Sequence, residues 1–381
     1  MDILKPFQLL LFIGNILFLF RNMSLVASRI RMTMMFAIIV EISVEIYNCF
    51  VIVYYSLYFH VGDCINIFMV FWNSLILILF SCYSSKRFEK LIICFNKHSS
   101  FFMKDELYLR GIKKRNLIMI IFFILFVILK IIFLYLGSKY YLLLRRRFSV
   151  FISMCLRLNA VFNDIRYFYE YLLLYTLLGL ISDQLDCVIR STVRDVHISS
   201  NPDRTEVSNI TLSTIQTEYE KNIEQWSQIY SGIANTTDMF NDIFGVQITI
   251  MLISAVTYIT IFLYTITFLS VYGVYDTATL VVYVQKTIIM HIQIFILSYT
   301  AQRINNKVET LRRRLGRLLL DSLNSKYLYV RATKDLLRFI SYRRLRIKAF
   351  GSFPVDMTLP PSCVMLFTSY TVIALQFNNV L

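Results

Sequence analysis

Charged side chains that interrupt long apolar stretches are the residues of this sequence most able to do chemistry. Asp164, Arg166 and Glu170 form the densest group, and Glu41 and Glu45 lie four residues apart, on one face of a helix. Charge is costly inside a membrane, so such residues face a protein interior, a partner or water. Two interpretations stay open: these side chains pair to hold helices together, or they contact a ligand. Three more titratable residues of this kind are Lys130, Lys286 and His291.

Patterns for catalysis, metal binding and nucleotide binding are missing from the sequence. The four histidines are far apart, and none has a partner at metal-ligand spacing. The ten glycines form neither a GxGxxG nor a GxxxxGK motif, and the seven cysteines form no CxxC pair. We therefore expect the protein to be no enzyme and to hold no cofactor or metal.

Composition places the chain in a membrane. Hydrophobic residues make up 57% of it and charged residues only 17%, with a mean hydropathy of +0.60, which is unlike a soluble globular protein. Crossing the hydrocarbon core takes about 20 mainly apolar residues. Seven segments meet this requirement and predict an all-α membrane protein with seven transmembrane helices, at residues 33–58, 64–83, 116–137, 160–182, 243–272, 278–300 and 354–378.

The distribution of basic residues predicts the orientation of these spans. If the N-terminus and the loops after spans two, four and six share one side, that side carries 31 of the 39 Lys and Arg residues and the other side five. The positive-inside rule then predicts a cytoplasmic N-terminus and an extracellular C-terminus. The run Arg145 to Arg147, between spans three and four, goes against the rule. On the same outer side, Cys64 and Cys155 lie where a disulfide could persist.

The charge pattern also separates the possible functions. A metabotropic seven-span receptor has its N-terminus outside, which would place the 31 basic residues on the wrong face. A secondary transporter would carry inverted repeats with Gly- or Pro-broken spans, and the sequence has neither. The net charge of +15 calls for no nucleic acid, because basic loops beside an anionic leaflet account for it.

The segments between the spans predict further helices. From residue 215, apolar and aromatic residues recur at helical spacing through Trp226 and Tyr230 to Ile233, and a second amphipathic helix is expected over 306–323. We expect both to bundle with the inner ends of the spans; the alternative is a pair of helices on the membrane surface. The polar residues 197–214 predict a flexible loop.

The last span carries the most specific motif. Ser369 and Tyr370 are followed by five mostly apolar residues and then by Gln376 and Phe377. A glutamine amide in a membrane helix must face protein or water. This pattern resembles the C-terminal signature of the insect gustatory receptor family, Thr-Tyr, five hydrophobic residues and Gln-Phe, with Ser369 in the threonine position. The likeness also includes the seven spans, the long charged loop before the last one, and residues 349–356 that lead into it.

The resemblance implies a ligand-gated, non-selective cation channel, homotetrameric or heterotetrameric, whose subunits each give the last span to a central pore. We expect Ser369, Ile373 and Gln376 to lie near one helix face, with Phe377 beside it, and to form the pore and gate. Apolar side chains can close a pore by dewetting, and amides can replace part of an ion's hydration shell.

The resemblance further implies a pocket for a tastant among spans two to six, in the plasma membrane of sensory neurons. Sugar-sensing members often carry Glu directly after the tyrosine of the motif. Thr371 stands there in this chain, which favours a bitter or plant-derived compound over a sugar. Aromatic side chains suit flat apolar ligands. The candidate pocket residues are Trp72, Tyr135, Asp164, Tyr167, Tyr169, Glu170, Tyr264 and Tyr283.

The predicted organisation has six parts. Pro6 to Phe20 is apolar but too short to cross, so we expect a re-entrant or interfacial helix there, with a signal peptide as the alternative. Pro360 and Pro361 predict a break or kink where the last span meets the membrane. The parts are a cytoplasmic segment with the interfacial helix (1–32), spans one to four (33–182), a cytoplasmic helical loop (183–242), spans five and six (243–300), a basic cytoplasmic helical loop (301–353) and the pore-lining seventh span (354–381).

Overall fold

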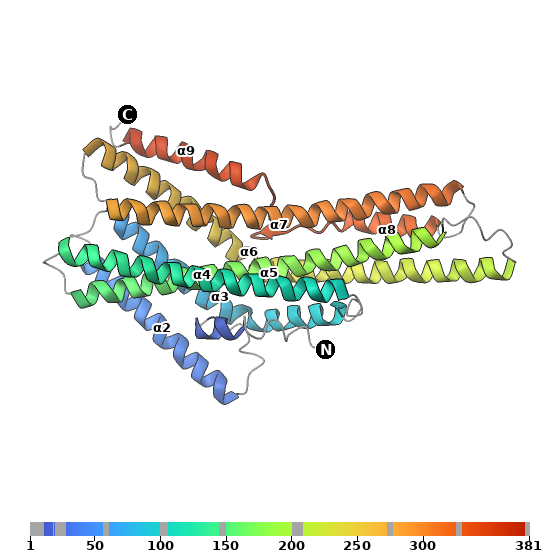
Figure 1. Cartoon of the computed structure of the whole chain (residues 1–381), viewed down its shortest axis with the longest axis horizontal. Helices are drawn as coiled ribbons and strands as arrows, with labels where there is room; N and C mark the ends of the chain where they lie inside the picture. Colours follow the sequence, from blue (N-terminus) through green and yellow to red (C-terminus); the bar gives the residue numbers. More distant parts are fainter. Residues whose placement is uncertain are drawn as a thin grey trace.

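The computed structural model describes residues 11–17, 19, 28–55, 61–99, 106–144, 150–199, 209–272, 277–324 and 330–377, and nearly all of them are helical (Figure 1). Two short strands, β1 (Lys348–Ala349) and β2 (Phe353–Pro354), pair antiparallel before the last helix. Besides a short helix at 11–16, the helices are α2 (Ser28–Tyr55), α3 (Val61–Ser99), α4 (Glu106–Leu144), α5 (Val150–Ser199), α6 (Asn209–Tyr272), α7 (Thr277–Asn324), α8 (Val330–Tyr342) and α9 (Leu359–Phe377).

Each of the seven predicted spans lies along one helix, α2 to α7 and α9, so the all-α seven-helix fold is confirmed. Three helices are much longer than a membrane crossing. α5, α6 and α7 have 50, 64 and 48 residues, which at about 1.5 Å per residue makes them about 75, 96 and 72 Å long. The segments expected as cytoplasmic helical loops are thus largely continuations of the spans, and they gather at the right-hand end of Figure 1.

Burial distinguishes a central helix from an outer one. Among the described residues, three helical segments are long and apolar enough to cross a membrane: Arg110–Tyr135, Leu158–Thr192 and Lys221–Leu263. In the most apolar stretch of each segment, only 17% of the α4 residues are buried, whereas 83% of the α5 residues are buried. α4 therefore turns apolar side chains outward, as contact with lipid requires. α5 is surrounded by α3, α4, α6 and α7 and forms the centre of the bundle.

The short N-terminal helix packs inside the bundle. Leu17 and Leu19 are 4% and 2% exposed and belong to the main core. Gly14 lies so close to the ring of Tyr169 on α5 that a β-carbon would come within 2.5 Å of the tyrosine hydroxyl. The described residues of this segment thus pack against α5, and the re-entrant and interfacial forms both stay predictions.

The predicted amphipathic helices are parts of α6 and α7. Their apolar stripes join the same continuous core as the membrane-spanning parts of the bundle. The bundling interpretation is therefore confirmed over the membrane-surface alternative. The buried stripe residues are Ile223, Trp226, Tyr230 and Ile233 on α6 and Leu311 and Leu315 on α7.

Polar contacts fix α7 against α5 where these helices continue beyond the predicted spans. Lys307 on α7 donates to the Ser182 hydroxyl at 2.7 Å and to its backbone oxygen at 3.1 Å, and it also pairs with Asp186. Burial lowers the pKa of Lys307, and the carboxylate of Asp186 opposes that shift. Arg314 adds a bond to the backbone oxygen of Ile189 at 3.1 Å.

Two local predictions differ from the structure. Residues 197–214 were expected to form a flexible loop, but α5 continues to Ser199 and α6 begins at Asn209; residues 200–208 lie outside the described part. Extending an existing helix is cheap, so polar residues are absorbed at both ends. Pro360 and Pro361 lie in the first turn of α9, where proline needs no N–H partner, so they start the helix and do not kink it.

An extended segment, residues 343–350, connects α8 to the β-hairpin and docks along α6. The Tyr230 hydroxyl donates to the backbone oxygen of Arg343 at 2.9 Å, and burial raises the pKa of that hydroxyl, which keeps it protonated. Asn241 binds the backbone on both sides, donating to Arg346 at 2.8 Å and accepting from Lys348 at 3.0 Å. The amide of Phe350 donates to the backbone oxygen of Gly245 at 3.0 Å.

A valine at Gly245 should loosen this docking. A β-carbon there would lie 3.2 Å from the backbone oxygen of Lys348 and 3.4 Å from the amide of Phe350, so the 343–350 segment would have to move. We expect Gly245→Val to destabilise the protein by about 1–3 kcal/mol, measured as a lower midpoint of thermal unfolding. Gly316→Val on α7 is the matched control. It has open space around it and should change stability by less than about 0.5 kcal/mol. Equal effects at the two positions would contradict the docking.

Side chains named in several predictions lie outside the described part of the chain. They are those of Cys64, Cys155 and Arg145 to Arg147, so the structure decides neither between a disulfide and two separate thiols nor the role of the basic run.

Candidate functional site

Arg166 on α5 is the centre of a buried polar cluster. Its side chain is fully buried. The Nη2 nitrogen donates to Glu41 on α2 at 2.5 Å, and Nη1 donates to Asn163 at 2.9 Å and to Ser74 on α3. The Nε nitrogen donates to the backbone oxygen of Leu17 at 2.9 Å. One guanidinium thus joins α5 to α2, to α3 and to the N-terminal segment, using the fork of donors that only arginine has.

Glu45, one turn after Glu41, completes this cluster. Its carboxylate accepts from Asn163 at 2.8 Å and from Asn159 at 3.0 Å, and it lies 4.0 Å from Arg166. Glu45 is 1% exposed. A buried carboxylate without such partners would cost several kcal/mol. The contacts of Glu41 and Glu45 therefore determine where α2 packs against α5.

Two further polar contacts tie α5 to the remaining helices. Asp164 binds Lys130 on α4 at 2.6 Å and lies 3.8 Å from Lys286 on α7. Glu170 accepts from Gln247 on α6 at 2.8 Å. The charged residues named in these paragraphs thus have polar partners on other helices. This agrees with the interpretation that they hold the helices together.

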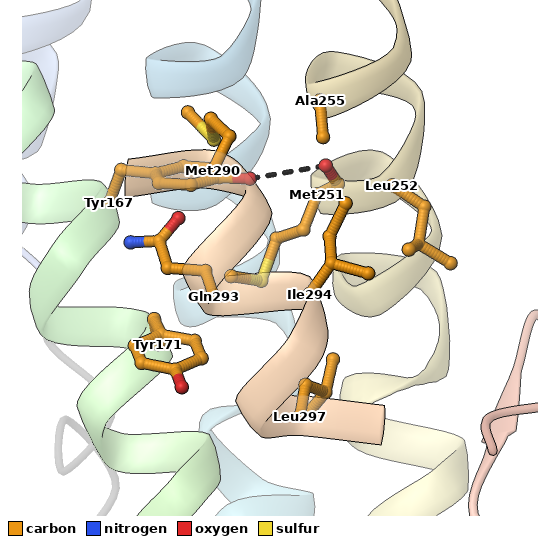
Figure 2. A pocket seen from close by; sticks show the side chains of 9 residues that line it. All are labelled: Tyr167, Tyr171, Met251, Leu252, Ala255, Met290, Gln293, Ile294 and Leu297. Atoms are coloured by element: carbon orange, nitrogen blue, oxygen red, sulfur yellow. Dashed lines mark hydrogen bonds between the residues drawn. The ribbon is translucent and has the colours of Figure 1, made fainter. Parts of the chain in front are cut away.

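A small cavity lies beside these clusters, between α5, α6 and α7 (Figure 2). Its volume is about 10 Å³, which is room for about one water molecule, and it is lined mostly by apolar side chains. Tyr167 borders it and donates its hydroxyl to the backbone oxygen of Met251 at 3.3 Å. The other lining residues are Tyr171, Leu252, Ala255, Met290, Gln293, Ile294 and Leu297.

Two polar atoms on this cavity are buried without a protein partner. Among the described residues, neither the Tyr171 hydroxyl nor the Gln293 side-chain oxygen has a hydrogen bond. Figure 2 shows the Gln293 amide turned toward Tyr167, whereas the hydroxyl of Tyr171 points the other way. Leaving a buried polar atom unpaired costs about 1–3 kcal/mol. A water or a polar group of a small ligand beside either atom would supply the missing partner.

The predicted pocket residues fall in different places. Tyr167 lines the cavity, whereas Tyr169 packs in the core against the N-terminal segment. Trp72 stacks on Phe68 and is 48% exposed, and Tyr135 is 65% exposed on the outward face of α4. The acidic candidates Asp164 and Glu170 are held by the partners described above. The side chains of Tyr264 and Tyr283 lie outside the described part of the chain.

Several lining residues escaped the sequence analysis. Tyr171 follows Tyr167 by one helical turn, so the spacing could have indicated it. Gln293 is a polar residue in an apolar span, which is the same signal that singled out Gln376. Met251 and Met290 carry no comparable signal, because only the rotation of the helices brings them to the cavity.

The predicted pore residues lie on α9, the most poorly covered of the spans. α9 contacts the core through Phe367, which is 2% exposed. The ring of Phe367 meets the His291 ring of α7 edge-on, with 6.0 Å between ring centres. Ser369 and Gln376 are exposed, and Ile373 is 45% exposed. The side chain of Phe377 lies outside the described part.

Helical geometry gives these residues a common direction. Gln376 follows Phe367 by nine residues, which at about 100° per residue is half a turn. Ser369 lies about 160° from Phe367 and Ile373 about 120°. Because Phe367 faces the helix's own bundle, the three predicted pore residues face away from it.

Removing the charge of Arg166 should leave two buried carboxylates unpaired. We expect Arg166→Gln to destabilise the protein by about 3–5 kcal/mol and to abolish the folded monodisperse peak in size-exclusion chromatography. Neutralising the partners as well, with Glu41→Gln and Glu45→Gln, should restore much of that peak. Arg338→Gln, at a pair whose side chains are 70% and 61% exposed, is the control and should have little effect. Failure of the triple change to rescue folding would contradict the pairing.

Comparisons with known proteins bear on the family. The chain is similar to two solved structures of the insect olfactory receptor OR5 from Machilis hrabei. One, in complex with eugenol, is 12% identical with a TM-score of 0.63; the other is 11% identical with a TM-score of 0.60. Each match covers 92% of this chain and 90% of the other. No curated protein sequence matches the chain. Residues 7–379 match the family described as 7tm Chemosensory receptor, and the chain therefore belongs to that family.

Proposed function

We propose that this chain is a gustatory receptor subunit that forms a ligand-gated, non-selective cation channel in the plasma membrane of sensory neurons. Four subunits, identical or related, each contribute α9 to a central pore. The chain carries its N-terminus in the cytoplasm and its C-terminus outside. Binding of a small compound in the cavity between α5, α6 and α7 opens the pore.

The one-sided packing of α9 carries this proposal. Phe367 attaches the helix to its own bundle, while Ser369, Ile373 and Gln376 face away from it. The Ser369 hydroxyl donates to the backbone oxygen of Met365 at 3.0 Å. The exposed amide of Gln376 has no such role for the helix and calls for water or a partner subunit. A ring of four such helices supplies both, with Gln376 and Ile373 turned toward the axis.

The cavity supports the ligand-gated part. The cavity has room for about one water molecule as it stands, so a compound binds there by displacing the surrounding side chains. Its walls are largely apolar, and Tyr171 and Gln293 offer two unpaired polar atoms. These features fit a bitter or plant-derived aromatic compound with one hydroxyl or ether group better than a sugar, which needs many polar contacts.

Two alternatives remain to be separated by experiment: a metabotropic seven-span receptor and a secondary transporter. The decisive measurement is ligand-evoked current from cells that express this chain alone while G-protein signalling is blocked. A channel gives unitary current steps under these conditions, whereas a metabotropic receptor gives no current and a transporter gives no unitary steps. An epitope tag after Leu381 should also be stained on intact cells, whereas a metabotropic receptor would present its N-terminus there.

Changes on the outward face of α9 should alter the pore. We expect Gln376→Ala to change ion selectivity at normal surface expression, because it removes a ring of amides from the conduction path. Ile373→Ser should raise the current without ligand, since a polar constriction no longer dewets. Val364→Ser is the matched control: Val364 is 48% exposed, as Ile373 is 45%, but lies half a turn away. If Gln376→Ala channels select as the parent does, α9 does not line the pore.

A change at the polar end of the cavity should alter ligand sensitivity alone. Gln293→Met keeps the side-chain volume but removes the unpaired oxygen. The loss of one hydrogen bond predicts a three- to tenfold rise in the ligand concentration for half-maximal current, at about 0.5–1.5 kcal/mol, with unchanged ion selectivity. Gln302→Met, on the same helix but away from the cavity, should leave the dose response unchanged. If both variants shift the dose response equally, the cavity is not the ligand-binding site.

A further inference from the structure

A basic surface runs along the 343–350 segment. Its residues alternate as in a strand, so that every second side chain points to the same side. Leu345, Ile347 and Ala349 are buried against α6, at 3% or less exposure. The residues between them, Arg344, Arg346 and Lys348, are exposed. Within the part of the chain that the structure describes, these three form no ion pair.

The hairpin adds two aromatic side chains to this surface. Phe350 and Gly351 both adopt the left-handed backbone conformation, with φ of 48° and 70°, and turn the chain back on itself. Phe350 and Phe353 are 65% and 67% exposed at this turn. Left-handed backbone is unusual for a phenylalanine and costs energy. Two phenylalanines held in water by a constrained turn indicate a surface that is covered in the working receptor.

Hydrogen bonds to α6 give the height of this surface relative to the membrane. The apolar stretch of α6 begins at about residue 243, and Gly245, at that boundary, binds the amide of Phe350. Asn241, which holds Arg346 and Lys348, lies four residues lower, or about 6 Å. The headgroup layer of one leaflet is about 5–7 Å thick. The two basic residues therefore lie at headgroup level, and Phe350 lies at the edge of the hydrocarbon.

The cation at the start of the segment behaves differently. Arg343 is held at Asn235 and Asp238 on α6, at 2.7 and 2.6 Å. Asn235 is ten residues below Gly245, or about 15 Å, which is beyond the headgroup layer. Arg343 thus has a protein carboxylate, whereas Arg344, Arg346 and Lys348 form no ion pair among the described residues.

We propose that Arg346, Lys348, Phe350 and Phe353 form a binding surface for anionic phospholipids of the cytoplasmic leaflet. The two cations contact the phosphate and carboxylate groups of the headgroups, and the two rings lie among the upper acyl carbons. The surface adjoins the start of α9, so bound lipid steadies the attachment of that helix. A second copy of the chain is a poorer occupant. It would place its own basic surface against this one, whereas the anionic lipids of the leaflet carry the opposite charge. The inference depends on the orientation of the chain and not on channel activity.

Lipid contact can be measured with a fluorescent reporter that needs neither a ligand nor a current. The full-length receptor with Phe353→Trp is reconstituted in phosphatidylcholine nanodiscs that contain brominated phosphatidylserine or, separately, brominated phosphatidylcholine. Bromine quenches tryptophan only at short range. The parent receptor supplies the background from Trp72 and Trp226. We expect the brominated phosphatidylserine to quench the added tryptophan at least threefold more effectively at equal mole fraction.

Charge removal tests the source of that preference. Each Lys or Arg near an anionic surface is worth about fivefold in binding, so Arg346→Gln with Lys348→Gln should bring the quenching ratio close to one. Arg313→Gln with Arg317→Gln removes the same charge from exposed positions on α7, about 20 Å beyond residue 300, and should keep the ratio. Unchanged thermal unfolding shows that each variant is folded.

Two results would overturn the proposal. The first is the absence of quenching by either lipid, or equal quenching by both in the parent reporter. The second is dissociation of the oligomer on charge removal, seen by light scattering in detergent, because the surface would then bind another copy of the chain.

Discussion

A charge inside a low-dielectric bundle must be paired, and this constraint shapes the whole molecule. Arg166 meets it by collecting Glu41, Glu45 and a backbone oxygen of the N-terminal segment around α5. Asp164 and Glu170 repeat the arrangement toward the other helices. Within two turns, α5 is thus bound to every major helix that surrounds it. An apolar contact tolerates sliding, but a buried ion pair fixes one register, because each displacement leaves a charge without its partner.

The same constraint explains how the faces of the bundle divide. α4 carries one charged residue in its apolar stretch, Lys130, which turns inward to Asp164 and leaves the rest of the helix to lipid. α9 carries no charge to pair and keeps one buried anchor, Phe367. Its remaining surface is unsatisfied by the single chain. Among the described residues, the bundle is therefore well packed around α5 and sparsely covered along α9, which is the face that the proposed channel uses.

Sequence patterns predicted the features that depend on local chemistry. Apolar length located all seven helices, and helical spacing identified Ile223, Trp226, Tyr230 and Ile233 as a buried stripe. Contacts between helices were less accessible. The sequence marked Arg166 and Glu41 as costly charges but could not say that they meet, and it marked Tyr167 but missed Met251, because helix rotation decides which side chains converge. The polar stretch 197–214 was assigned to a loop because composition alone ignores how readily a long helix extends.

The unbroken length of α6 has a mechanical consequence. Met251 lines the cavity, and Gly245, less than two turns away, holds the backbone of the hairpin that leads into α9. Between these points α6 is continuous helix, which is stiff on the scale of about 9 Å. The wall of the cavity and the root of α9 are therefore parts of one lever. A tilt of α6 at Met251 therefore also moves Gly245 and the hairpin that leads into α9, because no flexible joint lies between the two positions.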